Sequence, residues 1–154
     1  MISRYALDCR PYNTRWEDVT WETCSLRSWL NDDLVKEAFS AEEQAKIPIV
    51  TVTADKNPNS DKNPGKDTQN RVFLLSIPEV NKYFTSDAKR QCKPTPYAKA
   101  LGSSSNSNYH GACWWWLRTS GIEFTRAVDV YCNGTVGYDG GSVNNDDYAV
   151  RPAL

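Results

Sequence analysis

The sequence contains one histidine, His110, and no cysteine or histidine cluster with zinc-ligand spacing. Mechanisms that need several imidazoles are therefore excluded, and no metal site is expected. No apolar run approaches the roughly 20 residues of a membrane-spanning helix, and the first residues lack the pattern of a signal peptide. Eighteen basic and 19 acidic residues give a formal net charge of -1. This balance supplies no broad cationic field for nucleic acid.

The five cysteines are few, odd in number and widely spaced. Their density is too low for a scaffold held by disulfides. Free cysteine is among the most frequently buried residue types. We therefore expect buried free thiols, while one disulfide remains an alternative.

The length of 154 residues, with 40% hydrophobic and 24% charged residues, is typical of one folded domain. Apolar spacing predicts a helix over residues 23–30 and a second through Phe39, with Trp29 and Phe39 as core candidates. Ser40 with Glu43, and Ser76 with Pro78 and Glu79, predict the starts of two further helices. Strands are expected at 47–52 and 72–75, an exposed loop at 55–70 and a flexible loop at 102–108.

Three adjacent tryptophans, Trp114, Trp115 and Trp116, lie in a predicted strand. Neighbouring side chains in a strand face opposite sides, so the three cannot line one sugar-binding groove. Large aromatic side chains dominate core burial. We therefore expect that at least Trp115, or the pair Trp114 and Trp116, fills the core.

Beyond Gly121, valines recur among glycines and polar residues, a pattern that predicts short strands joined by turns. The side chains expected to point inward are Val128, Val130, Val136, Val143 and Val150. Tyrosine, asparagine, serine and glycine, which dominate the residues between them, are also the residues that antibody loops use for adaptable contacts. Ordinary solvated turns are the alternative interpretation, because asparagine, aspartate and glycine are common turn residues.

The residues missing from this region have a feature in common. Between Ile122 and Tyr148 there is no lysine, glutamine, methionine or tryptophan, and Glu123 is the one glutamate. These five residue types are those that no codon ending in C encodes. The segment is therefore interpreted as written largely in codons of the form NNC, which substitution at the adenines of AAC codons would generate.

The segments 114–121 and 149–154, with the spaced valines and glycines, resemble variable proteins of diversity-generating retroelements of gut bacteria and their phages. The upstream segments 5–9, 19–24 and 72–76 are also similar to this family. Thr119-Ser120-Gly121 departs from the Ser-Pro-Gly more frequent in the family. The resemblance covers nearly the whole chain, and it implies a further strand before Met1.

The resemblance implies an α+β domain over residues 1–154 with a C-type lectin-like fold, similar to that of formylglycine-generating enzymes. Short helices would pack on small antiparallel sheets, and the variable region would span residues 112–154. Reverse transcription that misreads template adenines would diversify this region, giving a non-catalytic protein without cofactors that binds a protein or cell-surface ligand. The implied variable positions are Phe124, Thr125, Arg126, Asp129, Tyr131, Cys132, Asn133, Thr135, Tyr138, Asp139, Ser142, Asn144, Asn145, Asp146, Asp147 and Tyr148.

Two alternatives belong to other functional classes. Residues 144–147 carry the oxygen ligands that calcium takes, as in a fixed lectin-like domain that binds glycans, although no Glu-Pro-Asn or Gln-Pro-Asp motif is present. An enzyme related to the formylglycine-generating group would need reactive thiols, for which Cys113 and Cys132 are the nearest candidates. Arg151 is expected to be either a buried paired charge or a solvated side chain.

Overall fold

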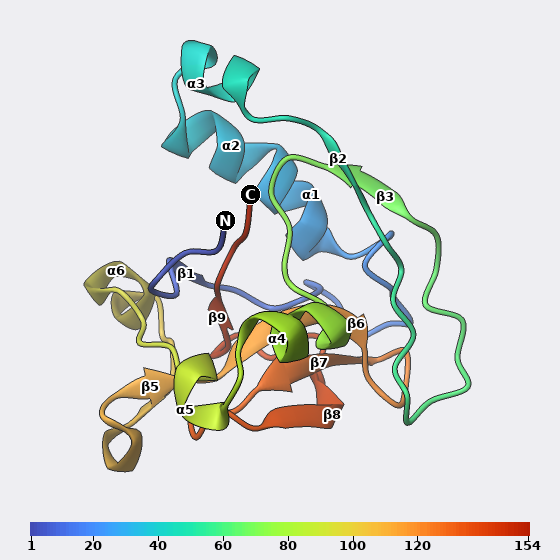
Figure 1. The fold of residues 1–154 in the computed structure, drawn as a ribbon, viewed down its shortest axis with the longest axis vertical. Helices are drawn as coiled ribbons and strands as arrows, with labels where there is room; N and C mark the ends of the chain where they lie inside the picture. The colour runs from blue at the N-terminus through green and yellow to red at the C-terminus, as the bar shows by residue number, and fades with distance from the viewer.

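The computed structural model describes residues 1–154 and has a mixed α+β architecture of short elements (Figure 1). The helices are α1 (Ser25–Asn31), α2 (Asp33–Ala38), α3 (Ala41–Lys46), α4 (Ile77–Tyr83), α5 (Asp87–Arg90) and α6 (Pro96–Ala100), with a 3-10 turn at Ser107–Tyr109. The strands are β1 (Asp8–Cys9), β2 (Val50–Val52), β3 (Thr68–Asn70), β4 (Ser105–Asn106), β5 (Ala112–Cys113), β6 (Trp115–Ser120), β7 (Arg126–Val130), β8 (Val136–Ser142) and β9 (Ala149–Val150). None of the helices combines the length and apolar content that crossing a membrane requires.

The main sheet has five strands in the order β1-β9-β6-β7-β8, and two small two-stranded sheets lie outside it. Strands β6, β7 and β8 are antiparallel neighbours, whereas β9 joins β6 in parallel and β1 in antiparallel. The two ends of the chain meet: Ile2 bridges Ala153, and the Met1 amino group donates to the Leu154 carbonyl at 2.6 Å. Figure 1 shows the termini side by side.

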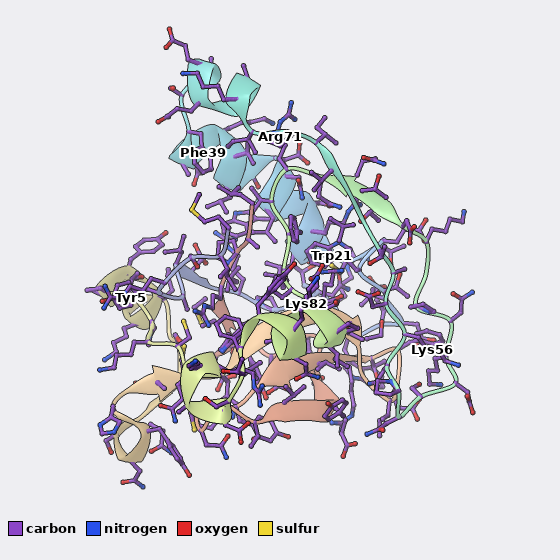
Figure 2. All side chains as sticks on the ribbon, viewed as in Figure 1. Tyr5, Trp21, Phe39, Lys56, Arg71 and Lys82 are labelled. Atoms are coloured by element: carbon purple, nitrogen blue, oxygen red, sulfur yellow. The ribbon has the colours of Figure 1, made fainter.

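Strand β6 is buried on both faces. Trp116 packs in one cluster with Leu26 and Leu30 of α1, and Trp115 packs in a second cluster with Val80 of α4. Helix α4 crosses one face of the sheet in Figure 1, and Figure 2 shows Trp21 of the first cluster between the sheet and α1. The alternation of neighbouring side chains is therefore confirmed, and so is the expectation that at least Trp115 fills the core. Both faces are covered, so Trp115 and Trp116 are both fully buried, while Trp114 is half-buried.

The predicted helix starts are confirmed where a capping box specified them. The Ser40 and Ser76 hydroxyls accept from the backbone N–H groups of Glu43 and Glu79, whose carboxylates accept from the cap residues' N–H groups in return. Trp29 and Phe39, expected in the core, are only half-buried. Figure 2 shows Phe39 beside α2, away from the main sheet.

The segments expected to be loops carry more structure than their composition indicated. Residues 68–70 pair with β2, and Asn57, only 4% exposed, donates to the Ser120 and Tyr138 carbonyls at 3.1 and 2.8 Å. The segment at 55–70 is therefore a largely exposed loop that is hydrogen-bonded to the sheet at Asn57. Figure 2 shows Lys56 on this loop. Strand β4 and the 3-10 turn similarly occupy the segment at 102–108 that was predicted to be flexible.

All five cysteines are free and buried, as expected. Arg151 is 6% exposed, so the solvated alternative is wrong. Its guanidinium donates to the Ser3 and Arg90 carbonyls at 3.0 and 3.4 Å and lies 5.0 Å from the centre of the Trp115 ring. Backbone carbonyls and an aromatic face therefore stabilise this buried charge where a carboxylate was expected.

Candidate binding face

The residues implied to be variable lie on β7, on the edge strand β8 and on the loops around them, here called the C-terminal face. The predicted anchors Val128, Val130, Val143 and Val150 are buried, whereas Val136 is only half-buried at the start of β8. Each short segment is thus held to the core by an apolar side chain. The polar residues between the anchors are free to face outward.

Fourteen of the sixteen implied positions have exposed or half-buried side chains. Asp129 and Cys132 depart from this pattern, at 0% and 4% exposure. Strand β7 pairs with β6, which is covered on both faces, and Asp129 lies opposite Trp116 with its side chain buried. Cys132 lies in the turn that follows β7, and its side chain is buried. Nine of the sixteen residues fall into three groups by their contacts.

The first group surrounds Asp129. A Cβ atom at Gly137 would lie 2.9 Å from the Asp129 carboxylate and 2.6 Å from the Tyr131 ring, so the absence of a side chain there lets both pack against β8. The Tyr148 ring stacks on Trp116 with 4.2 Å between ring centres, and its hydroxyl lies against Gly141. Two tyrosines on two segments therefore lie beside one buried carboxylate.

The Asp129 carboxylate is the least satisfied polar group of the face. Neither oxygen has a partner at full hydrogen-bond geometry. Burial raises the pKa of Asp129 to about 7, and the Gly141 amide, its own amide and the Tyr148 hydroxyl lower it only in part. Burial and the Asp129 charge in turn raise the pKa values of Tyr131 and Tyr148. Asp129 is therefore poised between its charged and neutral forms near neutral pH.

The second group is the turn between β7 and β8. The Asn133 side-chain oxygen accepts from the Thr135 amide and hydroxyl at 3.0 and 2.7 Å. Arg90 donates to the Gly134 carbonyl at 2.8 Å, and Gln91 donates to the Asn133 carbonyl at 3.2 Å. These bonds hold the turn against α5, so Asn133 and Thr135 have a structural role as well as an accessible position.

The third group lies at the other end of the hairpin. Arg126 donates to the Gly140 carbonyl at 2.8 Å, and the Ser142 hydroxyl lies 2.7 Å from the Asn144 side-chain oxygen. The Lys62 ammonium lies 5.0 Å from the centre of the Phe124 ring and 3.1 Å from the Glu123 carboxylate. Lys62 lies beside the face and belongs to the loop at 55–70, which was predicted only to be exposed. Nothing in the sequence predicts its contact with Phe124, because the two residues lie far apart in the chain.

A second connection that sequence analysis missed lies beneath the face. Arg118 of β6 is 2% exposed and forms ion pairs with Glu79 and, at 3.0 Å, with Asp55. It also donates to the Leu74 and Thr53 carbonyls. The guanidinium thus links β6, the start of α4 and the chain after β2. Removing one partner of such a buried group leaves uncompensated charge, so Arg118 supports the face from behind.

The oxygen-rich segment at 144–147 does not gather its side chains around one point. Asn144 and Asp146 are exposed, while the Asp147 carboxylate accepts from the Ser104 hydroxyl at 2.8 Å. No group of three histidine, cysteine or acidic side chains gathers in the structure.

The two cysteines considered for catalysis have raised thiol pKa values. The Cys113 thiol donates to the Cys92 carbonyl at 3.3 Å, and contact with Cys92 together with burial raises its pKa. Burial also raises the pKa of the Cys132 thiol. Because the thiolate is the reactive form, these shifts disfavour the reactive form at both positions.

Residues 1–154 match the family described as a domain of unknown function, DUF6273. Because the match spans the whole chain, the protein belongs to this family. No curated protein and no solved structure matches the chain.

Proposed function

We propose that this protein is a non-catalytic binding protein with a C-type lectin-like fold, whose C-terminal face is diversified by a retroelement to recognise varied macromolecular targets. The observation that carries the proposal is the separation of two residue classes along one segment. Residues of the variable set are accessible at fourteen positions, while four of the valines that alternate with them are buried. A surface built in this way can change its side chains with little loss of stability, because substitutions away from the core usually have small effects.

The composition of the face supports the same function. Tyr131, 39% exposed, and the half-buried Tyr138 and Tyr148 offer large contact areas at low conformational cost. Asparagine and aspartate side chains around them supply adaptable hydrogen bonds. The missing lysine, glutamine, methionine and tryptophan between residues 122 and 148 are what diversification through NNC codons would produce.

The encoding locus provides the decisive test. We expect a near-repeat of the DNA that encodes residues 117–148, differing from the gene at adenines and lying beside a reverse-transcriptase gene. The codons of the sixteen positions should end in C. The codons of the buried valines need not differ between the gene and its near-repeat. A locus with no near-repeat, and with other codon endings at these positions, would refute diversification. Glycan and calcium binding by a fixed domain would then be examined first.

A further inference from the structure

The buried Asp129 carboxylate carries a more specific inference about what the C-terminal face binds. Its exposure is 0%, and both oxygens lack hydrogen-bond partners. An unpaired carboxylate at this depth is costly unless a cation or a donor compensates it. Arg126, whose charge acts on Tyr131, donates to the Gly140 carbonyl. No cationic side chain of the protein therefore pairs with Asp129.

The surroundings of Asp129 are those of a site for a small organic cation. The Tyr131 and Tyr148 rings lie beside the carboxylate, against Gly137 and Gly141. Aromatic faces attract cations through their quadrupoles. Asp139 and Asp147 add negative charge, since they raise the pKa values of Tyr131 and Tyr148 respectively, and Arg126 is the one opposing charge at Tyr131. Two tyrosine rings, the buried Asp129 carboxylate and two further acidic side chains thus belong to one site.

Access to the carboxylate requires movement of one side chain. Tyr131 is 39% exposed and lies over Gly137 at the sheet edge, and exposed side chains change rotamer within nanoseconds. Tyr148 is less free to move, because it stacks on the fully buried Trp116. Movement of the Tyr131 side chain therefore opens access to Asp129, while the Tyr148 ring stays in place.

We propose that Asp129, Tyr131 and Tyr148 form a receptor for an alkylammonium group, such as a lysine side chain presented by a partner protein. An ammonium is a compact point charge, whereas a guanidinium is a wider planar fork, and the close packing around Asp129 favours the smaller cation. The inference rests on the proposed function in taking the C-terminal face as the binding surface. It adds the chemistry of the group that this surface accepts.

The probe is Nα-acetyl-lysine amide, titrated into the whole protein at pH 8 and followed by the amide NMR signals of Gly137 and Gly141. Nα-acetyl-norleucine amide, which has no charge on its side chain, is the matched probe. We expect saturable shifts with the lysine compound alone. Asp129→Asn should weaken its binding roughly tenfold to a hundredfold, the range expected for loss of a charged hydrogen bond. Binding should also strengthen from pH 6 to pH 8 in the wild type and not in the variant.

Asp146→Asn is the matched control, because it removes the same charge at an exposed position of the face and should bind like the wild type. Tyr131→Leu, an exposed change that the fold tolerates, should also weaken binding. Equal affinity in wild type and Asp129→Asn, or no shift with the lysine compound, would overturn the receptor. The locus test is independent of this result, so the receptor and the diversification can each fail alone.

Discussion

The state of Asp129 makes the stability of the protein depend on pH in a predictable direction. Burial raises its pKa from 3.8 to about 7, so the folded protein keeps a proton that the unfolded chain releases as pH rises between these values. The unfolded state therefore binds fewer protons, and stability falls as pH rises through this window. A shift of about three pKa units, at about 1.4 kcal/mol each, lowers the free energy of unfolding by about 4 kcal/mol across this window.

Replacing Asp129 with asparagine tests this reasoning, because the amide has the shape of the protonated acid and no charge. Urea unfolding of both proteins from pH 4 to pH 8.5 gives the difference in free energy of unfolding at each pH. We expect the two proteins to be nearly equal at pH 4, and the variant to be more stable by up to about 4 kcal/mol at pH 8. Other titrating groups cancel in the difference. A difference that stays constant from pH 4 to pH 8 would refute the assignment, and Asp146→Asn, at an exposed position, should give that constant result.

Three further predictions concern the support of the face, each measured by urea unfolding at pH 7. Arg118→Met should lower the free energy of unfolding by about 3–5 kcal/mol, since it strands two carboxylates that pair with this guanidinium; no loss would contradict its supporting role. Trp116→Ala should cost about 3–5 kcal/mol, and Trp114→Ala, at a half-buried position, less than half of this; equal losses would refute the placement of the two rings. Gly102→Ala should cost about 1–3 kcal/mol for its positive φ alone. Gly134→Ala should cost more, because its Cβ would also collide with backbone at the start of α5. A larger loss for Gly102→Ala than for Gly134→Ala would contradict the packing of the turn.

Local signals in the sequence were sufficient for α3 and α4, because a capping box specifies a helix start without reference to the rest of the fold. The short helices α5 and α6 were not expected. The segment 72–75 shows where local reasoning fails. It is buried as expected, yet it forms no strand beyond a single bridge between Phe73 and Ala153. The Asn31 side chain accepts from the backbone N–H groups of Arg71 and Val72 and donates to the Val72 carbonyl at 2.9 Å. A side-chain amide from α1 thus replaces the neighbouring strand, and periodicity contains no information about that partner.

At the candidate site, the sequence predicted the anchors better than their neighbours. Valines at alternate positions indicated an apolar face, and four of the five expected to point inward are buried. The prediction that residues between anchors are accessible fails at Asp129, because β7 is covered on both sides where it pairs with β6. The adjacent Trp115 and Trp116 on β6 could have predicted the burial of Asp129. Two adjacent buried tryptophans require a strand with two covered faces, and the strand beside it shares that environment.

The three groups on the C-terminal face differ in how much change they can absorb. The Asn133 side chain accepts hydrogen bonds from Thr135 inside the turn, and Arg90 of α5 donates to the Gly134 carbonyl. Replacement of Asn133 therefore alters the loop itself. Asn144 and Asp146 are exposed, so replacement there alters only the surface. Asp129 combines the properties of both, because its side chain is buried but borders two tyrosines of the face. In a diversified repertoire, position 129 would therefore set the charge beneath the binding surface, and the outer positions would set its shape.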